Sequence, residues 1–262
     1  MGKMVLIIFL LAHFLADFVF QSNEVATKKK EKITYLVKHI FIVFFVYFIF
    51  ILPIFSLRFL IIITAIALLH FLIDLLKITL EQREKIAEIH AFFIDQLLHI
   101  VILFLLYPAY WPISFQEWII RMFYQFSNFY ELTFSFNYFD ILRFIIIISG
   151  YIFVWKPGSQ IVEKTLKNYR ITKPEPVKEI LINTEKETAN PGELIGKLER
   201  VLLLSFIISN NFLAISIIFT AKSVARFSNF KDKDFANYYI IGTLISLLIA
   251  MGVGFVVKLF LG

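Results

Sequence analysis

The chain has 262 residues, of which 59% are hydrophobic and only 18% are charged, and phenylalanine alone occurs 32 times. An ordinary soluble domain is roughly 45–50% apolar, so a globule of this composition would lack the polar residues that cover a core. Cysteine is absent, which excludes disulfides, thiolate catalysis and cysteine-ligated zinc. The net charge of +6 suits membrane lipids as partners, and no pattern of basic and aromatic residues indicates nucleic acid. The composition predicts an all-α, polytopic integral membrane helix bundle.

Apolar segments of about the length needed to cross a bilayer follow one another along the chain. A helix needs about 20 apolar residues to cross the hydrocarbon core. Seven segments approach this length: 4–20, 35–55, 59–78, 91–110, 139–155, 199–220 and 239–261. We therefore expect six or seven spans. The first segment contains His13 and Asp17 and has no small-residue cleavage site, so we interpret it as a mature span and not as a signal peptide.

The charges of the connecting segments predict the side of the membrane on which each one lies. Lysine and arginine concentrate in 21–34, 79–90 and 156–198, whereas 52–58 and 112–138 each hold one arginine. Basic segments tend to stay in the cytoplasm, so we expect these three inside and the N-terminus outside.

The segment after 199–220 breaks this pattern. It should lie outside, yet 221–238 carries Lys222, Arg226, Lys231 and Lys233. Ser209-Asn210-Asn211 interrupts the preceding apolar run and would allow a re-entrant hairpin that returns to the cytoplasm. The sequence is equally compatible with this hairpin and with a seventh full crossing.

These features predict five regions in chain order. A four-helix membrane bundle over 1–110 is followed by an external, aromatic interfacial segment over 111–138 and by a fifth span over 139–155. A polar cytoplasmic linker with proline and glycine breakers covers 156–190, and a C-terminal membrane hairpin or pair of spans covers 191–262.

Ionisable side chains recur inside the first four spans. The pairs His13/Asp17, His70/Asp74 and Asp95/His99 are each four residues apart, so both members of a pair project from one helix face. The alternating direction of the spans places these groups at a similar depth, in the cytoplasmic third of the bilayer. An ionised side chain within the membrane costs about 2.5–3.5 kcal/mol, so such groups are retained where they pair, bind a cation or line a wet cavity.

We predict that these groups form one pocket for a divalent metal (zinc, manganese or iron), because imidazole with carboxylate suits these ions. The predicted ligands are His13, His70, His99, Asp17, Asp74 and Asp95. The aspartates would share general-base duty, and Lys77 would contact the substrate. Contacts to the ligands or to the substrate are expected from His39, Gln21, Gln96, Glu199, Arg200, Lys222 and Arg226. Such a pocket favours a metal-dependent hydrolase or transferase acting on a lipid-like or phosphate-bearing substrate.

Two other interpretations fit the same residues. Chains of His and Asp also serve as proton or ion paths in transporters, although the outward halves of the second to fourth spans are almost wholly apolar. The third interpretation is a structural polar network in a non-catalytic binding or scaffold protein. In the C-terminal region, Lys222 and Arg226 are four residues apart, which suits either a bound phosphate or nonspecific contact with anionic lipid.

The polar residues belong to ordered motifs. These are His13-x-x-x-Asp17-x-x-x-Gln21, Lys38-His39, His70-x-x-x-Asp74-x-x-Lys77 and Asp95-Gln96-x-x-His99. They resemble a widespread bacterial family of multi-pass membrane proteins, domain of unknown function 3307. The stretches 196–200, 221–227 and 239–244 are similar to an extension that many members carry. The resemblance implies a bacterial inner-membrane location and a single unit formed by the His, Asp and Lys residues, and it implies no particular activity.

Overall fold

The computed structural model describes residues 2–82, 88–118, 121–122, 125, 138–166 and 191–261. Within these ranges the chain is helical apart from turns and short extended links, and no strand occurs, which confirms the all-α class. Most of the interfacial segment expected over 111–138, and most of the linker expected over 156–190, lies outside the described residues. The chain divides into two compact units, Met1–Ser149 and Gly150–Gly262.

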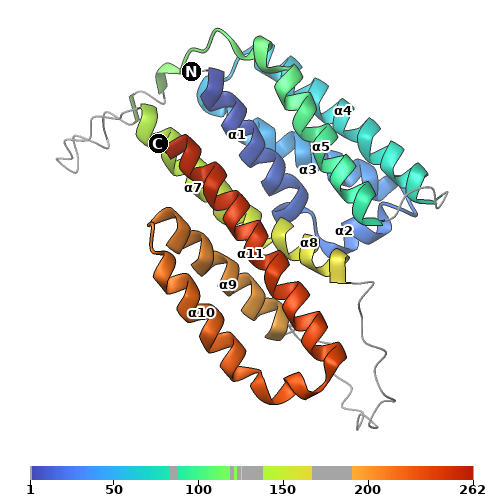
Figure 1. The fold of residues 1–262 in the computed structure, drawn as a ribbon. Coiled ribbons are helices and arrows are strands. Elements are labelled where there is room, and N and C mark those ends of the chain that lie inside the picture. Colours follow the sequence, from blue (N-terminus) through green and yellow to red (C-terminus); the bar gives the residue numbers. More distant parts are fainter. Residues whose placement is uncertain are drawn as a thin grey trace. The chain divides into compact units, whose positions relative to one another are not determined.

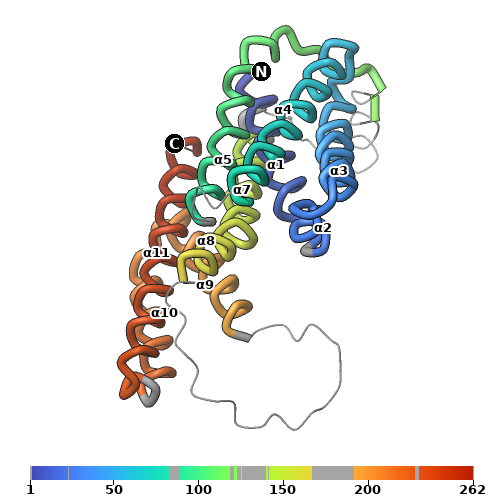
Figure 2. Tube along the Cα trace, turned by 90° about the vertical axis from the view of Figure 1, so that its right-hand side faces the viewer, coloured from blue at the N-terminus to red at the C-terminus, as the bar shows by residue number. Residues whose placement is uncertain are grey.

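The first unit is a helical bundle whose neighbouring helices are joined by short connections (Figure 1). In chain order its elements are α1 (Gly2–Phe14), η1 (Leu15–Phe20), α2 (Asn23–Lys28), α3 (Ile33–Ile51), η2 (Leu52–Ile54), α4 (Leu57–Gln82), α5 (Glu88–Leu105) and η3 (Tyr107–Tyr110). The long helices α1, α3, α4 and α5 pack against one another, as both views of the chain show (Figures 1 and 2). Helix α7 (Tyr138–Trp155) then leads into the second unit.

Local sequence signals set the ends of these helices. Helix α3 gives way at Leu52 to η2, whose second residue is Pro53, since proline cannot supply the backbone N–H that continues a helix. The Ser56 hydroxyl accepts a hydrogen bond from the backbone N–H of Phe59 at 3.3 Å and so caps the start of α4. Ser22 caps the short helix α2 in the same way, with Val25 N as the donor.

An apolar cluster fills the half of the bundle that contains the start of α1, the end of α3 and the start of α4. Its buried members include Val5, Phe9, Tyr47, Ile51, Phe59, Ile63, Leu103 and Tyr110. The Phe9 ring meets those of Tyr47 and Tyr110 edge to face, with centroids 5.2 Å away in both cases. This half of the bundle is therefore packed with hydrocarbon, and polar side chains gather toward its other half.

The second unit contains α8 (Pro157–Leu166), α9 (Pro191–Ile208), α10 (Phe212–Ala225), η5 (Phe227–Lys231) and α11 (Lys233–Leu261). Helices α9 and α10 lie side by side and are joined by a tight turn over 209–211 (Figure 1). Asn210 adopts a left-handed conformation with φ 59°, which asparagine tolerates, and the Asn211 side chain accepts a hydrogen bond from Ala214 N. A single continuous helix over 199–220 is therefore wrong, because the chain reverses direction within it.

Within the described part of the chain, five helical stretches are long and apolar enough to cross a membrane. They are Gly2–Phe20, Ile33–Ile54, Leu57–Gln82, Leu142–Leu166 and Lys233–Leu261. Helix α10 has 14 residues and a length of about 21 Å, which is short of the roughly 30 Å hydrocarbon core. These stretches indicate a membrane protein with several transmembrane helices.

Close packing of α9 against α11 depends on one glycine. A Cβ added at Gly254 would lie 2.5 Å from Cγ2 of Ile207, whereas one added at Gly252 meets nothing within 4 Å. We expect Gly254→Ala to destabilise the protein by about 1–3 kcal/mol through overpacking. The control Gly252→Ala should stabilise it by up to about 1 kcal/mol, because alanine favours a helix over glycine. Thermal unfolding in detergent measures both, and equal melting temperatures would contradict this account of the packing.

Candidate metal centre

The buried polar side chains of the first unit form one group. Tyrosine aside, the polar or charged residues buried among those described here are His13, His39, His70, Asp74, Asp95 and His99. They come from α1, α3, α4 and α5, at the end of α1, in the first half of α3, in the second half of α4 and in the middle part of α5. All the buried polarity described in this unit is therefore concentrated in one place.

Four side-chain atoms from three parts of the bundle form the centre of the group. Nε2 of His39 and Nε2 of His70 lie 3.1 Å apart, and Oδ1 of Asp17 lies 3.4 Å from each of them. Oδ2 of Asp74 lies 3.6 Å from Nε2 of His39 and 3.8 Å from Nε2 of His70. Ligand atoms held 2.0–2.2 Å from a tetrahedral zinc ion are roughly 3.3–3.6 Å apart. These four atoms therefore have nearly the spacing of the ligand set of one metal ion.

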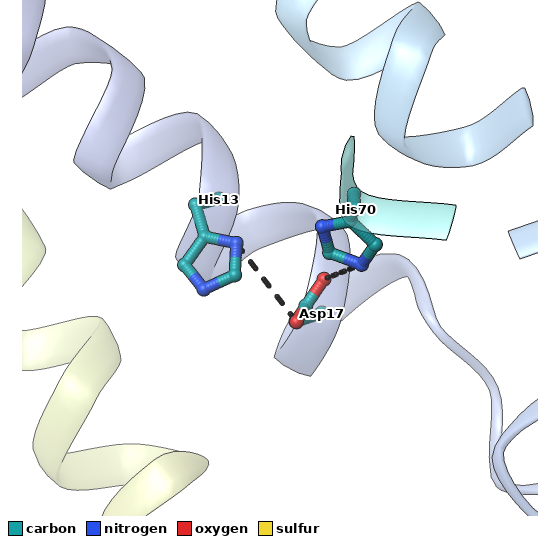
Figure 3. A group of neighbouring side chains, drawn as sticks. All are labelled: His13, Asp17 and His70. Carbon is teal, nitrogen blue, oxygen red and sulfur yellow. Dashed lines mark ion pairs between the residues drawn. The ribbon is translucent and has the colours of Figure 1, made fainter. Parts of the chain in front are cut away.

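His13 lies beside this centre. His13, Asp17 and His70 form one group whose ligand atoms all lie within 4.8 Å of one another, and His39, His70 and Asp74 form another (Figure 3 shows the first). Nδ1 of His13 is 3.9 Å from Oδ2 of Asp17, and its Nε2 is 3.3 Å from Oε1 of Gln96. The described residues thus contain histidine and aspartate groups that could hold a metal.

The π-helical turn η1 places Asp17 in the centre. A π turn inserts an extra residue into the helical repeat, and such turns are frequent at functional sites. Asp17 lies within η1, directly after the regular helix that carries His13. The carboxylate consequently faces His39 and His70 through Oδ1, while Oδ2 faces Nδ1 of His13.

Gln21 fixes which nitrogen of His39 is available. In the amide orientation that satisfies its neighbours, Oε1 of Gln21 accepts hydrogen bonds from Nδ1 of His39 at 3.2 Å and from Nζ of Lys29 at 3.1 Å. A histidine that donates from one ring nitrogen has its lone pair on the other, which is the usual arrangement of metal-binding histidines. Nε2 of His39 is thereby prepared to accept a metal ion.

Two lysines contact the aspartates of the site. Nζ of Lys29 lies 2.8 Å from Oδ2 and 3.0 Å from Oδ1 of Asp74. Nζ of Lys77 donates to Oδ2 of Asp95 at 2.9 Å. Lys77 was expected at the site, whereas Lys29 was not singled out by the sequence analysis.

The sequence does not distinguish Lys29 from its neighbours, because it is one of three consecutive lysines. Lys28 pairs with Glu24 on the surface, where its hydrogen bond lowers the pKa of the Glu24 carboxyl. Lys30 pairs with Glu81 and is also largely exposed. Lys29, at the C-terminal end of α2, is the one of the three that folds inward, with 10% of its side chain exposed. Only the path of α2 distinguishes it from its neighbours.

Several polar atoms of the site are buried and have no hydrogen-bond partner among the residues that the structure describes. They are Oδ1 of Asp17, Oδ1 of Asp95, and both Nδ1 and Nε2 of His99. The His99 ring stacks on the His70 ring, with centroids 3.9 Å apart. A buried polar atom without a partner destabilises the folded protein by about 1–3 kcal/mol. Packing alone therefore does not explain these polar side chains.

The predicted site residues thus fall in two places. The first unit brings together the residues expected from its spans, with His39 at the centre and Gln96 between His13 and Asp17. Asp95 and His99 lie beside the four central atoms, with the Lys77 ammonium on Asp95. The other four predicted residues lie in the second unit and make contacts there: Glu199, Arg200, Lys222 and Arg226.

The described residues thus form an all-helical protein with several candidate transmembrane helices and a buried polar cluster inside its first bundle. Residues 5–130 match the family described as protein of unknown function (DUF3307), and this part of the chain belongs to that family. Every residue of the candidate metal centre lies within the matched region, whereas the second unit lies beyond it. No curated protein and no solved structure matches the chain.

Proposed function

We propose that the first unit is a metal-dependent hydrolase or transferase that acts on a phosphate-bearing, lipid-like substrate at the cytoplasmic face of a bacterial inner membrane. The observation that carries this proposal is the spacing of the four central atoms, 3.1–3.8 Å in every measured pair. Two imidazole nitrogens and two carboxylate oxygens suit a divalent ion, with zinc as the first to test.

The substrate class rests on the lysines and on a groove. Lys29 and Lys77 bring two ammonium groups to the edge of the site. Lys29 can bind phosphate once Asp74 binds the metal, and Lys77 can bind phosphate with the N–H groups that do not contact Asp95. A small groove between α4 and α5 leads to Lys77 and Asp95, and its other lining is apolar: Ile73, Leu76, Leu80, Ile94 and Leu98. Apolar walls that end at a cation favour a lipid tail with a phosphate at its head.

A larger cavity near the start of α1 does not compete with this site. It is lined by Gly2, Lys3, Tyr107, Pro108 and Trp111, and it contains neither histidine nor carboxylate. Its lining offers no ligands for a metal and no general base.

The residues of the site can support hydrolysis of a phosphoester. The oxygen of one water molecule forms a bond to phosphorus, and the bond from phosphorus to the oxygen of the leaving alcohol breaks. One proton of the water passes to Oδ1 of Asp95, which accepts no hydrogen bond from the described residues, and then to the leaving oxygen. Lys77 holds the phosphate, and a divalent ion at the central atoms would acidify the water and polarise the phosphate. With an alcohol in place of water, the same steps transfer the phosphoryl group to that alcohol.

The apolar cluster weighs against a proton or ion path. A path needs polar side chains or water along its whole length. Beyond the site, the buried side chains of the cluster are hydrocarbon except for the Tyr47 and Tyr110 hydroxyls, and the Tyr110 hydroxyl donates to the backbone oxygen of Leu103. A chemical site open to one side fits this distribution better than a conduit.

We expect Asp95→Asn to lower kcat for the zinc-loaded protein by about 10²–10⁴-fold, the usual contribution of a positioned general base. Release of inorganic phosphate from phosphatidic acid in mixed micelles measures this, with zinc content determined in parallel. Asp140→Asn changes an exposed carboxylate of α7 and serves as the matched control. A zinc-loaded wild type that releases no phosphate from phosphatidic acid, or an Asp95→Asn variant as active as the wild type, would overturn the proposal.

A further inference from the structure

The second unit contains a separate group of polar residues from the middle of α9, the end of α10 and the first half of α11. Arg200 is fully engaged: its guanidinium donates to the backbone oxygen of Val154 at 2.8 Å, to Ser246 at 3.1 Å and to Ser159 at 2.5 Å. These bonds tie α9 to the end of α7, to α8 and to α11, and they satisfy the buried charge. Arg200 is therefore a structural residue, and the neighbouring Glu199 is different.

Glu199 is a buried carboxylate with only half of its hydrogen-bonding capacity used. Its side chain is 5% exposed, and Oε2 lies 2.5 Å from Nζ of Lys222 on α10. Oε1 is buried and has no partner among the described residues. An ionised carboxylate normally accepts several hydrogen bonds, so Oε1 is ready to accept a donor from a bound group.

Two hydroxyls on α11 belong to the same group. Tyr239 and Thr243 are four residues apart on one face of the helix, and the buried Tyr239 hydroxyl lies close to the side chains of Thr243 and Ser223 without a well-aligned hydrogen bond among the described residues. Nζ of Lys222 lies 5.3 Å from the centroid of the Tyr239 ring, which brings the hydroxyls and the Glu199–Lys222 pair into one cluster.

We propose that this cluster is a binding site for a phospholipid headgroup that carries its own hydrogen-bond donor, such as the glycerol headgroup of phosphatidylglycerol. Lys222, Tyr239 and Thr243 supply donors to the phosphate, and Arg226, one turn beyond Lys222, adds a second positive charge. Oε1 of Glu199 accepts from a hydroxyl of the headgroup, a contact that a quaternary ammonium headgroup cannot make.

The surface of α10 supports a lipid as the source of this phosphate. The helix is mostly apolar before Lys222 and exposes Leu213 and Ile217. Beyond the lysine, Val224 of α10 and Phe227 of η5 are also exposed. Hydrocarbon on the helix surface beside a cationic end is the arrangement of an element at the membrane interface. Acyl chains can lie along this surface while the phosphate reaches Lys222. This site contains none of the metal-centre residues, so it does not depend on the proposed function.

The test is lipid binding to the purified full chain, measured by native mass spectrometry and by thermal shift. Phosphatidylglycerol should bind about tenfold or more tightly than phosphatidylcholine, and soluble glycerol phosphate should bind more weakly than either lipid. Tyr239→Phe removes only a hydroxyl beside Ser223 and Thr243, so we expect it to weaken phosphatidylglycerol binding severalfold with little change in the melting temperature. Lys222→Met should weaken binding by about tenfold or more, and Lys231→Met, at an exposed lysine of η5, should leave it unchanged.

Three outcomes would overturn the proposal. These are equal binding of phosphatidylglycerol and phosphatidylcholine, full binding by Tyr239→Phe, and tight binding of glycerol phosphate without binding of the lipid. Binding by a His70→Ala variant separates this proposal from the metal centre, because phosphatidylglycerol should bind that variant as it binds the wild type.

Discussion

Alanine at His70 is expected to reduce the affinity of the protein for zinc by more than about 100-fold. Loss of a residue that only orients a ligand costs about 10–100-fold in metal affinity, and His70 is itself within 3.8 Å of three other ligand atoms. His39→Ala should have the same effect. His99→Ala should have a smaller one, because its ring stacks on His70 and it belongs to neither of the two metal-binding groups. Competition of purified protein with a zinc-chelating dye measures all three affinities.

His90→Ala is the matched control for this series. His90 is an exposed histidine of α5, the helix that also carries His99. Its replacement by alanine should leave the zinc affinity unchanged. Gel filtration and the helical circular dichroism signal establish that each variant is folded. Zinc affinity within threefold of the wild type in folded His70→Ala protein would contradict the assignment of the ligands.

Replacement of Lys29 should change stability and metal affinity in opposite directions. The Lys29 ammonium lies 2.8 Å from Oδ2 of Asp74, the same oxygen that faces His39 and His70. A divalent ion and an ammonium cannot share this oxygen without strong repulsion, so Lys29 competes with the metal. In Lys29→Met the metal-free protein should lose about 3–5 kcal/mol, because Asp74 remains as a buried charge without its partner. The same variant should bind zinc more tightly than the wild type.

Thermal unfolding with and without zinc checks this expectation. Zinc should raise the melting temperature of Lys29→Met by more than that of the wild type, since the ion supplies the positive charge that the substitution removes. Lys28→Met removes the preceding lysine, whose pair with Glu24 is exposed, and should change stability by less than about 1 kcal/mol. A Lys29→Met protein that is destabilised to the same extent with and without zinc would show that Asp74 does not bind the metal.

The sequence predicted the helical class and the proximity of the polar residues of the first four spans, because both depend on simple patterns. Long apolar runs require helices in a membrane, and the four-residue spacing of His70 and Asp74 places both on one helix face. The short connections between the spans make neighbouring helices antiparallel, which brings His13 and His99 to the same end of the bundle as His70.

The sequence could not show which of these residues lie at the centre of the site and which lie beside it. Asp17 reaches the centre through a π-helical turn, and its regular spacing from His13 gives no sign of this turn. His39 stands alone in its span, so no partner at helical spacing marks it as a central residue. The role of Lys29 depends on the path of α2, and the reversal at Asn210 depends on a backbone conformation that the adjacent asparagines permit but do not require.

The central claim is that His39, His70, Asp17 and Asp74 bind one divalent ion. X-ray absorption spectroscopy of the zinc-loaded protein, with the metal content determined by elemental analysis, tests it most directly. We predict about one zinc ion per chain, held by two imidazole nitrogens and two oxygens at about 2.0–2.2 Å. The same measurement on His39→Ala protein should show no stoichiometric zinc. A wild-type protein that holds no stoichiometric zinc, manganese or iron, or a bound ion without imidazole ligands, would contradict the claim.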